Sequence, residues 1–238
     1  MTRIIAIPIL LINLLLTSCD HESINIKGEI TQTEFSFTNY STLKVSDDFK
    51  VYVNFSSTEE KIIVEANSDL QDRIIIQKKG NTLIVKLRNN VNIRGNATMN
   101  LYLTTANISS FLISGDVDIT LEDELVTETA LIVMSGDSNF KGQLNVLSLD
   151  LDIDGDSDVD LYGTADSVKA ELSGDSDLRD YDLSIKELNI NLSGDSDAYL
   201  TVSESIKIRA TGDSSLYYKG EASILEKYIT GDSKIIKR

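Results

Sequence analysis

The chain has 238 residues, with 38 acidic and 22 basic side chains, a formal net charge of −16, and one Cys, one His, one Pro and no Trp. Such a chain lacks the cationic surface that displaces counterions from nucleic acid, so we expect no nucleic-acid partner. The single cysteine excludes a disulfide within the chain. The single histidine, His21 near the N-terminus, excludes Ser-His-Asp and histidine-based metal chemistry inside the fold.

The N-terminus predicts a secretory signal peptide. A short basic start is followed by a run from Ile4 to Leu16 that is almost wholly apolar and too short to span a bilayer as a helix. The run ends in Leu-Thr-Ser-Cys, which resembles a bacterial lipoprotein signal, in which small residues precede a cysteine that receives lipid. We therefore expect a signal peptide over residues 1–18, lipid chains on Cys19 that hold the protein on a membrane, and a tether over residues 19–36. An ordinary signal peptide with an incidental cysteine is the alternative.

The first half of the mature chain predicts conventional β-structure. Runs rich in β-branched and aromatic residues identify five strand candidates. These are Phe49–Phe55, Lys61–Ala66, Arg73–Gln77, Leu83–Leu87 and Met99–Leu103. Lys79-Gly80-Asn81 predicts a hairpin turn between the third and fourth candidates. The Asn-rich, polar stretch from Leu87 to Thr98 predicts a loop.

The second half repeats the dipeptide Gly-Asp seven times. The gaps between successive copies are 21, 19, 19, 20, 18 and 19 residues, and Ser follows the pair in six copies. The pairs are Gly115-Asp116, Gly136-Asp137, Gly155-Asp156, Gly174-Asp175, Gly194-Asp195, Gly212-Asp213 and Gly231-Asp232. A fixed period near 20 residues is typical of stacked repeats, each too small to bury a core of its own.

Each repeat predicts strands rather than helices. Before each glycine, apolar and polar residues alternate with a period of two, as in the segment Leu149–Ile153. The alternation continues through the glycine, which places Gly and then Ser among the inward-facing positions, at a corner where the strand bends. Lys227 breaks the inward pattern in the last full repeat, so we expect that coil to be frayed.

These patterns predict an all-β fold, namely a β-solenoid or right-handed parallel β-helix-like stack of coils of about 19 residues. Each coil is expected to hold about three short strands. The less regular N-terminal β coils and their hairpin are expected to cap the stack. We expect this domain over residues 37–220, followed by a terminal coil or cap over residues 221–238.

The acidity belongs to the repeats. Residues 20–112 carry 11 acidic and 10 basic side chains, whereas residues 113–238 carry 27 acidic and 11 basic. Stacking at about 4.8 Å would place the corner carboxylates in one outward column, and the carboxylates two residues further on in a parallel column. The resulting acidic ladder comprises Asp137, Asp156, Asp158, Asp175, Asp177, Asp195, Asp197 and Asp213.

Unit charges at this spacing repel by roughly 1 kcal/mol even in bulk water, so something must offset the repulsion. One account is local hydrogen bonding from backbone N–H groups or from Ser hydroxyls of the adjacent coil. The other is calcium, which prefers six to eight oxygen ligands and is the one cofactor that the ladder suggests. The Gly-Gly-x-Gly-x-Asp repeat of calcium-binding β-rolls is absent from the sequence, and the identity of any metal stays open.

Tyrosines and loops bear on other functions. Tyr162 and Tyr181 share one expected repeat position, and Tyr199 and Tyr217 share another. Stacked tyrosines offer a platform for sugars or proteins, although cross-strand pairs that stabilise a sheet face are the commoner use. Regular short coils leave few long loops with which to build a cleft, so we expect no enzyme. A carbohydrate-active enzyme with paired carboxylates is the least expected class.

An ordered set of motifs resembles the "putative auto-transporter adhesin head GIN domain" of lipoproteins from Bacteroidetes-type bacteria. The motifs are Phe-Lys-Val-Tyr-Val at 49–53, Ile-Ile-Val-Glu-Ala-Asn at 62–67, the hairpin at 74–85, Ser-Gly-Asp-Ser at 173–176 and 193–196, and Leu-Tyr-Tyr-Lys-Gly at 216–220. The matching stretch runs from about Phe37 to Gly220. The family commonly has small uncharged residues at the corner, so the acid there is a feature of this member.

The resemblance implies an all-β, β-helix-like domain whose molecular function is not established, and it supplies no catalytic residues. Combined with the lipoprotein signal, it leads us to expect an outer membrane lipoprotein on the cell surface or the periplasmic face. Its expected partners are the membrane, through lipid on Cys19, and an extracellular protein or glycan. A periplasm-facing structural or envelope-stress protein is the alternative.

Overall fold

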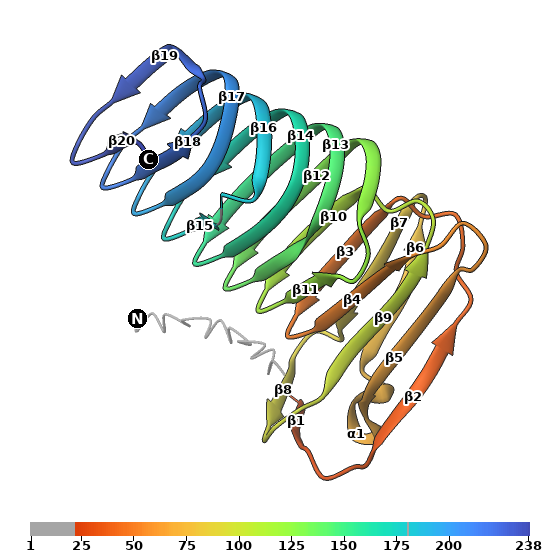
Figure 1. Cartoon of the computed structure of the whole chain (residues 1–238). Coiled ribbons are helices and arrows are strands. Elements are labelled where there is room, and N and C mark those ends of the chain that lie inside the picture. Colours follow the sequence, from red (N-terminus) through yellow and green to blue (C-terminus); the bar gives the residue numbers. More distant parts are fainter. Residues whose placement is uncertain (1–21, 180) are drawn as a thin grey trace, which may run out of the picture.

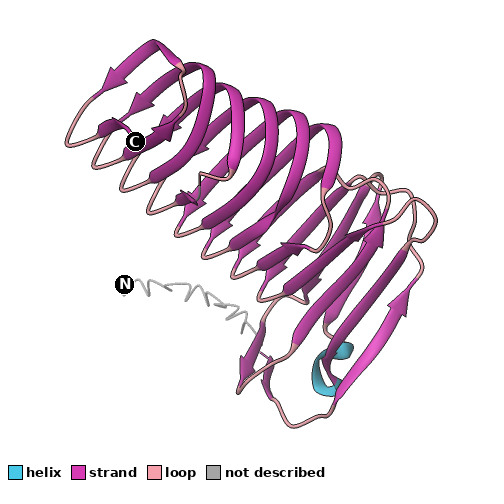
Figure 2. Ribbon diagram, in the orientation of Figure 1, coloured by secondary structure: helices cyan, strands magenta, loops and turns pink. Residues whose placement is uncertain are grey.

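The computed structural model describes residues 22–179 and 181–238, which form a rod built almost entirely of β-strands (Figures 1 and 2). Its N-terminal part holds β1 (Glu22–Asn25), β2 (Ile30–Phe35), β3 (Thr42–Asp47), β4 (Lys50–Phe55), β5 (Lys61–Asn67), α1 (Ser68–Gln71), β6 (Ile74–Lys79), β7 (Thr82–Leu87), β8 (Val91–Arg94) and β9 (Met99–Thr105). Within the described residues, no helix has the length and apolar character needed to cross a bilayer.

The remaining strands form a β-solenoid of about seven turns of about 19 residues, which confirms the predicted fold class. They are β10 (Ser110–Gly115), β11 (Asp118–Leu121), β12 (Leu125–Gly136), β13 (Asn139–Gly155), β14 (Asp158–Leu172), β15 (Asp177–Arg179), β16 (Leu183–Leu192), β17 (Asp197–Ala210), β18 (Ser215–Lys219), β19 (Ser223–Ile229) and β20 (Lys234–Lys237). All pairs between successive coils are parallel.

Residues one repeat apart pair directly, so the predicted columns exist. Gly115 pairs with Gly136, and Gly136 pairs with Gly155. The inward positions of each strand are buried and apolar, as at Leu151, whose partner in the next coil is the buried Ala170. The sharp corners that follow each glycine line up as short loops along one edge of the rod (Figure 2).

The corner glycines do not face inward as expected. They lie at the surface with positive φ angles, +97° at Gly155 and +84° at Gly174. The backbone N–H of Asp175 donates to the carbonyl oxygen of Gly155 at 2.8 Å, and the same oxygen accepts from the hydroxyl of Ser176 at 3.3 Å. A methyl group on Gly174 would collide with that oxygen. Glycine is therefore required by the backbone conformation and by the close approach of the adjacent coil.

The serine after each Gly-Asp pair does face inward, as predicted. Ser138, Ser157, Ser176, Ser196 and Ser214 are all buried. Most of these hydroxyls donate to the carbonyl of the glycine in the preceding coil. A buried hydroxyl without a partner would be costly, so this bond makes Ser acceptable at a core position.

The N-terminal strands close one end of the rod by extending both solenoid sheets. Strands β3 and β4 pair in parallel with β10 and β11, which continues the solenoid by one coil. Beyond them, β6 lies antiparallel to β7, and β5 lies antiparallel to both β9 and β2. Leu70 of α1 is fully buried at this end. The end is therefore a sandwich-like cap, in agreement with the expected irregular coils and hairpin.

Two expectations for the N-terminal part were wrong. The stretch 19–36, expected to be a tether, contains β1 and β2, and the expected loop Leu87–Thr98 contains β8. Strand β1 pairs in parallel with β8, and β2 forms the outer edge next to β5. These strands are short and largely exposed, and the apolar alternation of β8 covers only four residues, too few to stand out in an Asn-rich stretch.

We predict that Gly174→Ala destabilises the fold by at least about 2 kcal/mol, because it adds a collision with a backbone carbonyl to the strain of a positive φ angle. Gly80→Ala is the matched control, since Gly80 has a φ of +58° and open space around its Cα. Urea denaturation measures both losses. Equal losses would contradict the role assigned to the contact between corners.

Candidate functional site: the acidic edge and the adjacent groove

The corner carboxylates form an exposed row along the edge of the rod. The backbone N–H groups of Asp137, Asp156, Asp175, Asp195 and Asp213 donate to the preceding corner glycines at 2.8–2.9 Å. Their side chains are exposed, and no hydrogen bond or ion pair joins these five carboxylates to another residue in the described part of the chain. The nearby Ser hydroxyls donate to backbone carbonyls instead. Local hydrogen bonding therefore does not offset the repulsion within this row.

The second row of the ladder lies two residues further along each coil and is partly buried. Asp158 pairs with Asp177, and Asp177 pairs with Asp197, so three carboxylates follow one another on successive coils. Arg179 bridges two of them, with its Nη2 at 2.9 Å from Asp158 and 3.0 Å from Asp177. Asn139, Asp118 and Lys50, in that order, continue the row toward the cap.

Burial raises the pKa of Asp158 above its ordinary value; Arg179 opposes the shift, and the negative charges of neighbouring aspartates add to it. The pKa of Asp197 is also raised, first by burial and then by the charge of Asp177, while hydrogen bonds from Ser215 and Tyr199 act in the opposite direction. Partial removal from water therefore destabilises the ionised form of both carboxylates.

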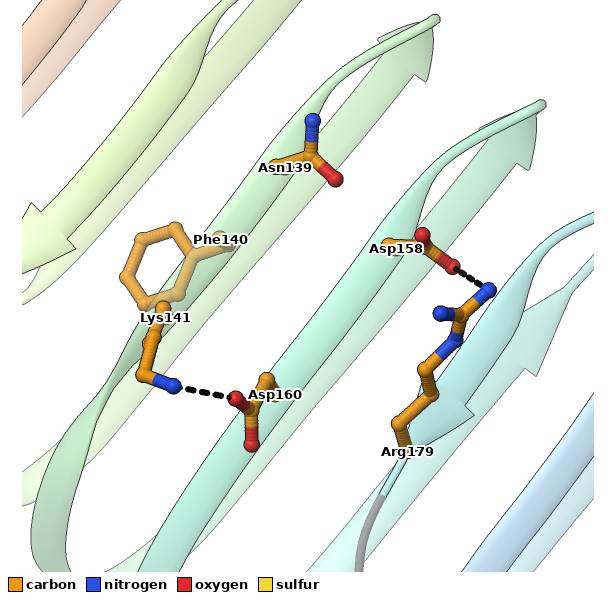
Figure 3. A pocket seen from close by; sticks show the side chains of 6 residues that line it. All are labelled: Asn139, Phe140, Lys141, Asp158, Asp160 and Arg179. Atoms are coloured by element: carbon orange, nitrogen blue, oxygen red, sulfur yellow. Dashed lines mark hydrogen bonds and ion pairs between the residues drawn. The ribbon is translucent and has the colours of Figure 1, made fainter.

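A shallow groove of about 420 Å³ runs beside the second row. It is lined by Asn139, Phe140, Lys141, Asp158, Asp160 and Arg179. Figure 3 shows that two ion pairs cross it, one from Arg179 to Asp158 and one from Lys141 to Asp160, the latter at 2.8 Å. Each pair links adjacent coils and leaves charged groups of both signs at the surface. The groove therefore offers an open contact area crossed by two ion pairs rather than an enclosed pocket.

The structure places the aspartates of the expected acidic ladder in two rows with different surroundings, and their role as a site stays a prediction. Among the described residues, no group of three or more Asp, Glu, His or Cys side chains converges in a way that could hold a metal ion. Cys19 and His21 lie outside the described residues. Arg179 was not predicted as part of the site, although its position two residues after Asp177 on the same strand face could have revealed it.

The tyrosines form a cluster whose ring faces are largely covered. Tyr199 and Tyr217 stack with ring centroids 4.7 Å apart, as their shared repeat position predicted. Tyr181 does not share a position with Tyr162, because it lies in a turn and meets the edge of Tyr199 at 5.9 Å. Lys219 and Arg238 lie over the faces of Tyr181 and Tyr217, respectively. This arrangement favours sheet stabilisation over a sugar-stacking platform.

We predict that the free energy of unfolding rises as the pH falls from 7 toward the ordinary aspartate value of 3.8. A raised native pKa means that the folded state binds more protons in this window, so acidification stabilises it. Asp197→Asn should flatten part of this rise, by less than about 1 kcal/mol because the carboxylate is partly solvated. Urea unfolding at several pH values measures both effects.

At still lower pH the trend should reverse, because hydrogen bonds hold the pKa values of Glu65 and Asp69 below their ordinary values. A stability that falls steadily from pH 7, or a pH dependence that Asp197→Asn leaves unchanged, would contradict the effect assigned to the raised pKa values of Asp158 and Asp197.

Comparisons with known proteins agree with this geometry. The family model "Putative auto-transporter adhesin, head GIN domain" matches residues 39–222. A structure described as a putative adhesin from Bacteroides fragilis is 20% identical, with a TM-score of 0.85, covering 90% of this chain and 100% of that chain. Two Parabacteroides distasonis structures, a putative adhesin and a "putative lipid binding protein", are 16% and 15% identical, each with a TM-score of 0.74 and covering 91% of this chain and 100% of their own.

At these identities the solved structures establish a shared fold alone. A search of curated proteins gives no match. The family model, in contrast, spans most of the chain and includes the cap strands from β3 onward together with the solenoid up to β18. The chain therefore belongs to the family described as "Putative auto-transporter adhesin, head GIN domain".

Proposed function

We propose that the protein is a lipid-anchored binding protein of the cell envelope that uses its acidic edge to hold a basic surface of an extracellular partner. The observation that carries this proposal is the corner row, in which exposed carboxylates without a partner among the described residues recur on successive coils of the rod. A single exposed charge contributes little to binding, whereas a fixed row concentrates the field along one edge. A protein with Lys and Arg side chains spaced along its surface would neutralise several carboxylates at once.

The anchor in this proposal is lipid on Cys19, which follows the predicted signal peptide over residues 1–18. Only Asp20 and His21 separate Cys19 from β1, so the lipid would hold the cap end of the rod close to the membrane. The family description as an adhesin head supports a position in the cell envelope. The proposal includes no catalytic step, and the described residues contain neither His nor Cys.

A capture experiment tests the role of the acidic edge. The bait is the chain from Asp20 onward, which contains every described strand. Replacing Asp156, Asp175 and Asp195 together by Asn should reduce the captured envelope partner several-fold, and raised salt should do the same to the wild-type chain. A parallel capture with and without calcium separates direct charge pairing from a calcium bridge between carboxylates.

The matched control replaces Asp150, Asp152 and Asp154 by Asn, which removes the same charge from the outer face of the neighbouring sheet. This control should capture the partner as the wild type does. Equal losses in both triple variants would show a response to net charge alone, and unchanged capture by the corner variant would exclude the acidic edge.

A second experiment tests the anchor. In the full chain, Cys19→Ser should move the protein from the membrane fraction to the soluble fraction, because the lipid has no other attachment point. Protease treatment of intact cells then separates the two locations: a surface binding protein is cut, whereas a periplasm-facing structural protein is protected. Membrane retention of the Cys19→Ser variant would contradict lipid anchoring.

A further inference from the structure

The last coil of the described chain leaves one end of the solenoid uncovered. Strand β19 pairs with β17, and β20 pairs with β18, and neither has a neighbour on its other side within the described chain (Figure 1). The backbone groups on these outer sides are therefore unpaired. An edge of this kind is a template on which another chain can add strands.

The terminal coil also exposes apolar side chains, one of them in an inward column. Ile224 lies in register with Ile206, yet it is 39% exposed, whereas Ile206 is fully buried. Leu225, the extra residue at a bulge between Ile224 and Glu226, is 61% exposed. Every earlier coil has its inward column covered by the next coil, so this end combines a free strand edge with an uncovered hydrophobic strip. Both features favour stacking of a further coil.

Two lysines interrupt this strip, one on each sheet. Lys227 lies in register with the buried Ile208, and Lys237 lies in register with the buried Tyr218. Both lysines therefore stand in inward columns that carry apolar or aromatic residues in the preceding coil. They are exposed here, and Lys237 pairs with Glu221 at 3.1 Å. No hydrogen bond or ion pair joins the ammonium group of Lys227 to another residue among those described.

A lysine at these two positions does not destabilise the fold as long as no further coil covers this end. The aliphatic stem of each lysine covers part of the uncovered strip, and its ammonium group remains in water. A coil stacked on this end would bury both charges above an apolar core, at a cost of several kcal/mol for each charge left without a partner. Among the residues that the structure describes, the inward columns offer no carboxylate to pair with them.

We propose that Lys227 and Lys237 form a charged stop that prevents a second copy of this chain from stacking on the open end of the solenoid. The partner excluded is another copy because its last coil is the matching uncovered end, with the same corners and inward columns, whereas its other end is closed by the cap. The stop keeps the rod monomeric although its last coil carries free strand edges. This inference is independent of lipid anchoring and of the acidic edge.

Sedimentation of the chain from Asp20 onward, over a concentration series, tests the stop. The wild type should remain monomeric. The double variant Lys227→Ile/Lys237→Ile should associate, with an average mass that rises at least about twofold at the highest concentration. Adding Leu225→Arg to the double variant should return the chain to a monomer, because it places a new charge on the same strip.

Lys234→Ile is the matched control, since Lys234 lies on the same coil but in an outward column, in register with Ser215. It should remain monomeric. A second double variant, Lys227→Met/Lys237→Met, keeps the side-chain length and removes the charge. It tests the proposal if the isoleucine variant does not fold. A β-type circular dichroism spectrum identifies the variants that are folded. Association of the wild type, association of Lys234→Ile to the same extent, or monomeric behaviour of every folded double variant would overturn the proposal.

Discussion

The structure depends on one recurring contact between the corners of adjacent coils. At each corner, the carbonyl oxygen of a glycine accepts the backbone N–H of the aspartate in the next coil, and at most corners also a serine hydroxyl. The positive φ angle of the glycine points this oxygen at the next coil, and the missing side chain lets that coil approach. Because the same contact recurs, successive coils share one register, and like residues form columns.

This register has opposite consequences for the core and for the surface. Inside the rod it places apolar residue above apolar residue, so each coil buries the face of its neighbour. On the surface it places like charge above like charge, which costs stability in the corner row. Where a basic residue stands beside a column of carboxylates, as Arg179 does next to Asp158 and Asp177, its side chain pairs with the carboxylates of two coils. Among the described residues, the corner row has no such basic partner, so its repulsion remains.

The fold was predictable because its signals repeat. The period of Gly-Asp, the alternation of apolar residues and the two columns of carboxylates all follow from short segments that recur seven times. The parts that sequence reasoning missed occur once. Strands β1 and β8 form a small two-stranded sheet with little apolar alternation, and the turn at Tyr181 shifts one residue out of the repeat position. The orientation of the corner glycine was missed because side chains alternate with a period of two residues only in straight strands, whereas the backbone turns at the corner.

The candidate site was predictable as a set of columns but not as a set of contacts. Register alone placed Asp158, Asp177 and Asp197 on one line, whereas the ion pairs of Arg179 depend on how a long side chain lies across two coils. The corner aspartates show the opposite case, in which the backbone and not the side chain makes the contact between coils. Their backbone N–H groups hold the coils together, and any residue other than proline supplies that group. Their carboxylates add repulsion and no contact that stabilises the fold. The stability of the fold therefore explains the glycine and the serine of each corner. It does not explain the aspartate between them, whose role must lie in what binds to this edge of the rod.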